Sequence, residues 1–323
     1  MTRRGMMLAG AALLSGGAVG IPAADEPLAV RLGYAPTDKL LILHADDLGM
    51  SHSANAASLK AMTEGVVSSA SVMVPCPWFP EMARWARERP ELDLGLHLTL
   101  TSEWNVYRWR PVAPPDRVPG LLDPDGFMWR DVENVVKHAR PEEVETEIRA
   151  QIARARHFGM NPTHVDSHMG TLFANPRFFE VYTRVAREEK VLPMLMEPSP
   201  ETLASARRAG VEYGPLAAKL RGAGFVLLNR LSTGLQGNTL EARREEFRSF
   251  LRGLKPGVTE LIVHLASDDE EIRHITNNWR NRYNELLLFT EPASRDLLKA
   301  EGVRTIGYRP LARLWEQTRR PAA

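Results

Sequence analysis

Short β-rich segments alternate with helical segments along most of this 323-residue chain, and this alternation limits the fold more than any other feature. A helix between two strands returns the chain to the edge where it began, so repeated strand–helix units build parallel sheets. About seven units occur without a glycine-rich dinucleotide-binding motif, which favours a deformed parallel (β/α) barrel, similar to a TIM barrel, over a doubly wound open sheet. The predicted strands cover 40–44, 68–74, 93–98, 163–166, 224–228, 260–264 and 303–308.

The clearest helix is predicted over 141–158. Pro141 suits the first helical turn, and Gly159 follows the last one. Ile148 and Ile152 belong to an apolar stripe with intervals of three and four residues, which is the pattern of a helix that buries one face.

Residues 36–316 are predicted to form a single catalytic domain, because 44% hydrophobic and 25% charged residues are enough for a core of barrel size. The stretch 103–130 interrupts the alternation with several prolines and aromatic residues, so we expect a long insertion there. Trp104 and Trp109 make this insertion a candidate lid or substrate wall, and a packed surface loop is the alternative.

Residues 1–24 are predicted to be an N-terminal export signal. Arg3 and Arg4 give a basic start, an apolar stretch follows over 6–20, and small residues surround Ala23. This pattern predicts export, to the periplasm of a bacterium. No apolar segment of the sequence approaches the ~20 residues that a membrane span requires.

The charges of the chain nearly cancel, with 41 Lys and Arg against 40 Asp and Glu. Nucleic-acid binders need a basic surface to neutralise phosphates, so nucleic acid is excluded as the main partner. The single cysteine, Cys76, excludes an intramolecular disulfide and a thiolate-rich zinc site. Self-association into a homo-oligomer is left open.

Asp46 and Asp47 follow an apolar run and are the strongest chemical signal in the sequence. Adjacent carboxylates at the end of a buried strand repel each other and are costly to desolvate, so a fold that keeps them usually uses them on a cation or a proton. Neighbouring side chains of a strand point to opposite faces, so both reach one site only if the strand ends here, before Gly49. A capping aspartate beside a solvated one is the alternative.

Three histidines are candidate partners for this pair. His97 lies within an apolar run, and His164, Asp166 and His168 occupy alternate positions of one segment. In a strand these three share a face, which fits a metal ligand with supporting residues. One aspartate and two histidines hold a divalent ion and leave a position for water, as hydrolysis requires. A lone buried histidine is more often a core residue, so the interpretation of His97 depends on its partners.

Four motifs in this order resemble the YdjC/ChbG-like family of carbohydrate deacetylases, a polysaccharide-deacetylase-like barrel family. The motifs are ADDLG at 45–49, GVVSSA at 65–70, GLH at 95–97 and PTHVDSH at 162–168, and the resemblance extends over about 40–309. It implies a (β/α) barrel, one divalent metal ion (Mg²⁺ or Zn²⁺) and hydrolysis of an acetamido group on an amino sugar.

The resemblance also implies roles for individual residues. Asp47, His97 and His168 would hold the metal, and Asp46 would be the general base that takes a proton from water. His264, at the end of a late strand, would be the acid that protonates the leaving amine, with a core histidine that caps the strand as the alternative. The supporting or substrate-binding residues would be Asp166, expected to orient His168 or His264, together with His164, Trp104 and Trp109.

One departure from the family pattern concerns the substrate. Two further histidines of the family are replaced here by Gly170 and Leu172. A smaller, more apolar wall is expected at these positions, which indicates a different or lipid-linked acceptor.

The sequence therefore predicts a metal-dependent hydrolase that removes an N-acetyl group from an amino-sugar-containing carbohydrate or glycolipid. Two alternatives stay open. A barrel metallohydrolase of phosphoesters would be expected to carry more cationic or metal-ligating residues at its strand ends. A non-catalytic sugar-binding protein on a decayed barrel is suggested by Gly170 and Leu172.

Overall fold

The computed structural model describes residues 26–208 and 210–319. The predicted export signal, residues 1–24, lies outside the described residues. Within the described ranges, no helix is both long and apolar enough to cross a membrane.

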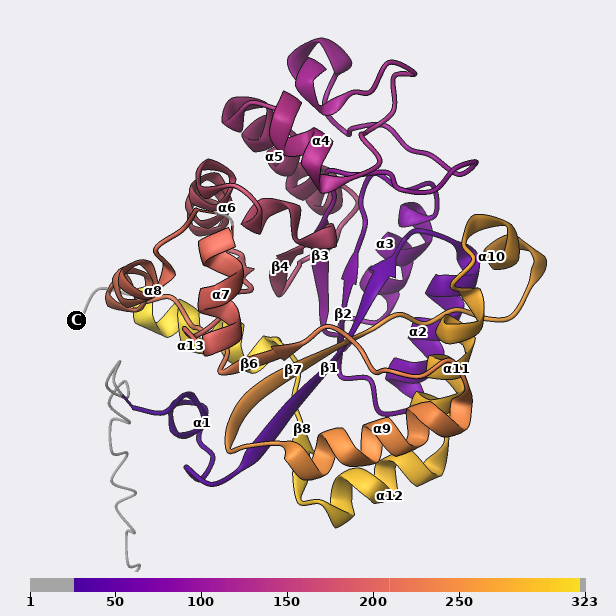
Figure 1. Cartoon of the computed structure of the whole chain (residues 1–323), viewed down its shortest axis with the longest axis vertical. Helices are drawn as coiled ribbons and strands as arrows, with labels where there is room; N and C mark the ends of the chain where they lie inside the picture. Colours follow the sequence, from indigo (N-terminus) through magenta and orange to yellow (C-terminus); the bar gives the residue numbers. More distant parts are fainter. Residues whose placement is uncertain (1–25, 209, 320–323) are drawn as a thin grey trace, which may run out of the picture.

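The centre of the fold is a sheet of parallel strands that curls into a half-barrel (Figure 1). The strands are β1 (Lys39–Leu48), β2 (Ser69–Val72), β3 (Leu94–Leu98), β4 (His164–Ser167), β5 (Leu192–Pro193), β6 (Arg230–Ser232), β7 (Gly257–Val263) and β8 (Val303–Thr305). Their order is β5-β4-β3-β2-β1-β7-β6, with β8 beside the start of β1. An isolated parallel bridge between Met196 and Leu228 links the two ends of this order. The predicted deformed parallel (β/α) barrel is confirmed.

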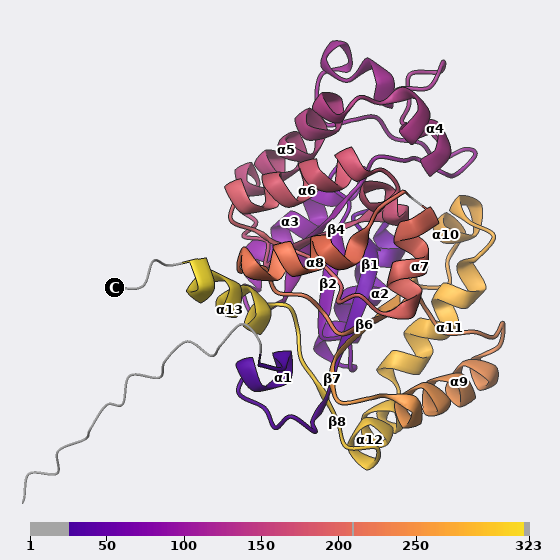
Figure 2. The same cartoon turned by 60° about the vertical axis from the view of Figure 1, so that its left-hand side comes forward.

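Helices surround this sheet. In chain order they are α1 (Leu28–Arg31), α2 (His52–Thr63), α3 (Phe79–Glu88), α4 (Val132–His138), α5 (Pro141–His157), α6 (Pro176–Glu188), α7 (Pro200–Arg208), α8 (Tyr213–Gly222), α9 (Leu240–Gly253), α10 (Glu270–Ile275), α11 (Trp279–Thr290), α12 (Pro292–Ala300) and α13 (Arg309–Arg319). In Figure 2, α6, α7 and α8 lie in front of the sheet. The helix predicted over 141–158 is confirmed as α5, and Gly159 takes a left-handed φ of 82° where that helix ends.

The strand β1 is the central element of the sheet. Residues 40–48 of this strand are all buried, and it pairs with β2, β7 and β8. A parallel strand covered on both faces carries a continuous apolar run, which explains the four consecutive apolar residues at 40–43. The carboxyl ends of β1, β3 and β4 meet at one edge, where Asp46, His97 and Asp166 lie.

Two of the short strands differ from the prediction. The segment 225–228 is buried as expected, but only Leu228 forms a bridge, and the strand β6 begins at Arg230. Apolar residues show that a segment is buried and not which backbone groups pair, so the sequence placed this strand too early. The strand β5 was missed because it has two residues, one of them proline.

The insertion 103–130 contains two 3₁₀ turns, Pro115–Arg117 and Pro119–Leu121, and no named strand among its residues. Glu147 of α5 fixes it to the barrel by accepting the backbone N–H groups of Val112 (2.9 Å) and Ala113 (2.8 Å). These bonds keep the prolines of the insertion against the domain.

Candidate metal centre

The end of β1 brings both aspartates to one site through a bulge in the strand. Between Ala45 and Leu48 the strand contains one more residue than its partner does between Ala70 and Val72. Asp47 has a φ of 68°, a left-handed conformation that costs a non-glycine residue about 1–3 kcal/mol. β1 ends at Leu48, directly before Gly49 as expected, but it is longer than the predicted strand 40–44, and the bulge turns the second carboxylate.

Asp47, His97 and His168 form a compact cluster of three buried side chains. Oδ1 of Asp47 lies 3.6 Å from Nε2 of His97 and 3.5 Å from Nδ1 of His168. This oxygen accepts no hydrogen bond from the described part of the chain. A buried carboxylate oxygen without a partner is costly, and a cation between the three atoms would satisfy it. The donors present therefore fit a divalent metal ion.

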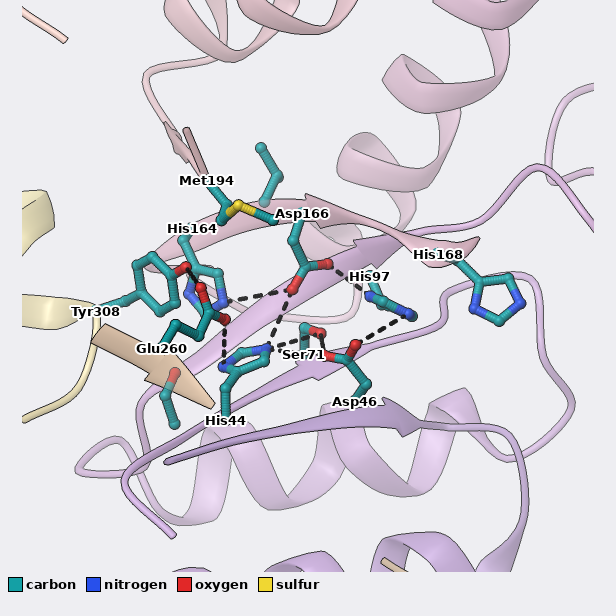
Figure 3. Close-up of polar contacts among 12 residues, drawn as sticks. His44, Asp46, Ser71, His97, His164, Asp166, His168, Met194, Glu260 and Tyr308 are labelled. Carbon is teal, nitrogen blue, oxygen red and sulfur yellow. Dashed lines mark hydrogen bonds and ion pairs between the residues drawn. The ribbon is translucent and has the colours of Figure 1, made fainter. Parts of the chain in front are cut away.

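Asp46 lies beside this cluster and has different partners. Its Oδ1 is 3.2 Å from Nε2 of His44 and accepts a hydrogen bond of 3.3 Å from the Ser71 hydroxyl. Its Oδ2 is 3.7 Å from Nε2 of His97, so it faces the same space as the three candidate ligands. Figure 3 shows Asp46 between His44 and His97. The two neighbouring carboxylates thus have unequal surroundings, which suits unequal roles.

Two acidic residues orient the histidines of the cluster. Asp166 contacts Nδ1 of His97 at 2.6 Å and leaves Nε2 facing the aspartates, as in carboxylate–histidine–metal sites. Glu103, the first residue of the insertion, contacts Nε2 of His168 at 3.1 Å. The expectation that Asp166 orients His168 or His264 differs from this geometry, because β4 pairs with β3 and places Asp166 directly opposite His97.

An arginine completes the surroundings of Asp47. Nη2 of Arg282, on α11, donates to Oδ2 of Asp47 at 2.6 Å. Burial opposes ionisation, but the charge of Arg282 and then the contact with His168 hold the pKa of Asp47 well below its usual range. Asp47 therefore stays a carboxylate, the form that binds a metal.

The acidic residues around the cluster keep His97 and His168 protonated when no metal is bound. Burial lowers the pKa of His168, but Glu103 and Asp47 outweigh it and raise that pKa to about 10. Burial also lowers the pKa of His97, but Asp46 and Asp166 outweigh it and raise that pKa above its ordinary value. The cluster attracts positive charge, and a metal ion must displace these protons in order to bind.

Beneath the cluster lies a second, fully buried polar network (Figure 3). Nε2 of His44 contacts Asp166 at 3.1 Å, and the Tyr308 hydroxyl donates to Glu260 at 2.6 Å. The ring of His164 stacks on Tyr308 with 3.8 Å between centroids. Burial lowers the pKa of His44, but Asp166 and then Asp46 outweigh it and raise that pKa well above its ordinary value. A His44 cation therefore lies between these two carboxylates. His164 belongs to this network rather than to the cluster of Asp47, His97 and His168.

The remaining predicted site residues have varied positions. His264 follows β7, and its backbone N–H donates to Glu285 at 2.6 Å. Trp104 is partly buried, whereas Trp109 is 3% exposed and donates its indole N–H to the Thr101 carbonyl.

The two positions where the chain departs from the family pattern also differ from each other. Gly170 lines a cavity beside His168, but Leu172 is fully buried in the core and does not line it. The expectation that both form an apolar substrate wall therefore fails for Leu172, because the 3₁₀ turn over His168–Phe173 points it inward.

Sequence patterns did not single out several residues at or near the cluster. Glu103 and Arg282 contact its members directly. His44 and Ser71 contact Asp46, and Glu260 and Tyr308 belong to the neighbouring buried network. His44 and Glu260 carried a usable signal, since each is a charged or polar residue inside a predicted buried strand. Arg282 carried none, because it lies in an ordinary helix 235 residues along the chain from Asp47.

Comparison with known proteins gives consistent results. Residues 40–300 match the model of the YdjC-like protein family. A carbohydrate deacetylase of Geobacillus stearothermophilus is 30% identical over 274 residues, which is 84% of this chain and 98% of that protein. A carbohydrate deacetylase of Thermus thermophilus is 38% identical over 52% of this chain, and the match spans only 57% of that relative's length.

A solved structure agrees over most of the chain. An Enterococcus faecalis protein, provisionally described as a cellobiose-phosphate cleavage protein, superposes with a TM-score of 0.72 at 25% identity. The superposition covers 85% of this chain and 99% of the other. Together with the match of the family model over 40–300, these similarities show that the chain belongs to the YdjC-like protein family.

Proposed function

We propose that this protein is a metal-dependent hydrolase that removes the N-acetyl group from an amino-sugar-containing carbohydrate or glycolipid. The observation that carries the proposal is the unpartnered Oδ1 of Asp47, which faces His97 and His168 next to Asp46. Membership of the YdjC-like family and the carbohydrate deacetylases among its relatives support the same reaction.

Asp47, His97 and His168 would hold one divalent ion, Zn²⁺ or Mg²⁺. Two imidazole nitrogens and one carboxylate oxygen favour Zn²⁺, since Mg²⁺ prefers ligands that are all oxygen. When bound, such an ion supplies Lewis acidity, which polarises a carbonyl and makes water more acidic.

Asp46 is the candidate general base. Its Oδ2 faces the cluster, while Ser71 and His44 hold its Oδ1. A carboxylate fixed on one oxygen and free on the other can accept a proton from the attacking water without moving. His264 is the candidate acid that returns a proton to the leaving amine, because it follows β7 on the side of Asp47.

The test is acetate release from a panel of N-acetylated sugars by the metal-loaded wild type and by Asp46→Asn. We expect the variant to lose about 10²–10⁴-fold in kcat, the usual contribution of a general base, and to keep its metal. Asp125→Asn, at an exposed position of the insertion, is the matched control. An Asp46→Asn protein with full activity would exclude Asp46 as the base, and a wild type that releases no acetate would exclude the reaction.

The proposal includes export. The basic and apolar pattern of residues 1–24 supports it. Cell fractionation of the full chain and of a variant that lacks residues 2–24 tests it. We expect only the full chain outside the cytoplasm, and equal distribution of the two forms would contradict export.

A further inference from the structure

A cavity of about 860 Å³ lies beside the metal centre, next to His168. The loop that follows His168 lines one side of it with Met169 and Gly170, whose φ angles are 52° and 65°. This left-handed pair leaves the Met169 side chain 49% exposed, which is unusual for a large apolar residue next to a buried polar site. The wall of the cavity therefore includes Met169, the residue that follows the candidate ligand His168.

The other walls come from the region of β5 and β6, the two ends of the strand order, and from α6, α7 and α8. Residues 194–196 continue from β5, and Arg230, Leu231 and Thr233 come from β6 and the residue after it. The backbone N–H of Met194 donates to the Val165 carbonyl at 2.8 Å, next to Asp166, and Figure 3 shows Met194 near that carboxylate. The cavity thus occupies the same edge of the barrel as the metal centre.

The described lining residues are mostly apolar. They include three methionines and two phenylalanines, and the polar ones are Ser199, Thr202, Arg208, Tyr213, Arg230 and Thr233. Methionine side chains adapt to irregular apolar ligands. A sugar ring needs several hydrogen-bond partners, and this lining is poor in them.

Most polar groups of the lining are already paired within the protein. The Tyr213 hydroxyl donates to the Met196 carbonyl at 2.6 Å, and Arg230 donates to the Pro256 carbonyl at 3.1 Å. The hydroxyls of Ser199 and Thr202 contact each other at 3.1 Å. Among the described lining residues, Arg208 and Thr233 remain to meet polar groups of a ligand, whereas an apolar chain fits the rest of the lining.

From these observations we propose that the cavity binds an apolar group attached to the amino sugar, so that the substrate is an N-acetylated amino sugar with an alkyl or acyl chain. This inference rests on the proposed deacetylation, because it takes the metal centre as the place of the acetamido group. When the acetamido group lies at Asp46, the alkyl or acyl chain of the substrate passes Met169 and Gly170 and enters the cavity.

The experiment compares methyl, butyl and octyl glycosides of N-acetylglucosamine, each below its micelle concentration, with N,N′-diacetylchitobiose. Complete burial is worth about fourfold per methylene, so we expect kcat/KM for acetate release to rise at least tenfold from methyl to octyl. Chitobiose should not exceed the methyl glycoside. Equal kcat/KM for all alkyl glycosides would overturn the inference.

Two matched variants on α7 test the location. Ala206→Trp fills the cavity, and Ala204→Trp adds the same side chain at an exposed position of the same helix. We expect the octyl-to-methyl ratio of kcat/KM to fall below threefold in Ala206→Trp and to stay at the wild-type value in Ala204→Trp. Equal ratios in both variants would place the chain elsewhere and overturn the inference.

Calorimetric titration of the octyl glycoside separates this inference from the proposed reaction. Binding that Ala206→Trp removes and Ala204→Trp keeps supports the cavity as an apolar-ligand site even if no acetate is released, in which case only the reaction fails. Acetate release without any preference for chain length, and without such binding, supports the reaction and refutes the cavity.

Discussion

The two halves of the barrel edge are built from opposite chemistry. Around β1, β3 and β4, buried carboxylates, histidines and an arginine contact one another within 2.6–3.7 Å. Around β5 and β6, the cavity walls are mostly methionine, phenylalanine, leucine and small side chains, with two arginines among them. Charged groups in a protein interior need fixed partners, whereas apolar walls need only complementary shape. The polar half, around β1, β3 and β4, is therefore suited to hold the reacting groups. The apolar half, around β5 and β6, is suited to select the group that is attached to them.

The largest effect is expected from removing the arginine of the polar half. Arg282→Met leaves the buried Asp47 carboxylate without its partner, and such losses cost about 3–5 kcal/mol of unfolding free energy. Urea unfolding in the presence of a chelator measures it. Arg280→Met, at an exposed position of the same helix, is the control. Equal stability of the two variants would show that Asp47 does not depend on Arg282.

The next largest effect is expected in the pH dependence of the free energy of unfolding, and it comes from the buried Glu147 of α5. Burial raises the pKa of Glu147 from 4.5 to about 7, against the hydrogen bonds from Ala113 and Val112. The folded protein therefore binds more protons than the unfolded chain between these values, and this group's contribution to stability falls by up to about 3 kcal/mol as pH rises from 4.5 to 7.

Urea unfolding at several pH values tests this with Glu147→Gln, which cannot titrate. We expect the variant to lose that part of the pH dependence while Glu142→Gln, on the exposed face of the same helix, keeps it. Identical pH profiles of wild type and Glu147→Gln would contradict the prediction.

A smaller effect is expected from the residue that orients a candidate ligand. Asp166→Asn weakens the hold on Nδ1 of His97, and changes of this kind cost about 10–100-fold in metal affinity. Competition with a chelator for Zn²⁺ gives the dissociation constant, with Asp125→Asn as the control. An unchanged constant would mean that the position of His97 does not depend on Asp166.

The smallest effect belongs to the apolar half. Tyr213→Phe removes the hydrogen bond to the Met196 carbonyl and should cost about 0.5–1.5 kcal/mol of unfolding free energy. Zn²⁺ affinity should not change, because the phenol hydroxyl donates to the Met196 carbonyl and not to Asp47, His97 or His168. A weaker Zn²⁺ affinity in this variant would show that the two halves are coupled and would break the comparison.

Much of the fold was accessible from local signals. The run at 40–43 predicted a buried strand, and Pro141 and Gly159 marked the ends of α5, because burial and helix capping depend on neighbouring residues. The positions of β5 and β6 were not accessible, since strands of two and three residues owe their pairing to partners elsewhere in the chain.

The candidate site was accessible only in part. The residue types at 46, 47, 97 and 168 indicated a metal and a base, and the structure brings these side chains together. Of the partners that fix them, Asp166 was predicted, but as the partner of His168 or His264, whereas Glu103 and Arg282 were not predicted. Asp166 faces His97 only because β4 lies beside β3, and Glu103 reaches His168 only because the insertion folds back.

Short-range patterns of the sequence were enough for the strand–helix alternation, the burial of the central strand and the chemical types available for catalysis. The tertiary structure decided which groups meet. A bulge at Asp47 turned two neighbouring carboxylates to one site, and an arginine 235 residues away compensated one of them. The physical reason is that charge pairing and bulge register depend on distances in space, which a local pattern does not contain.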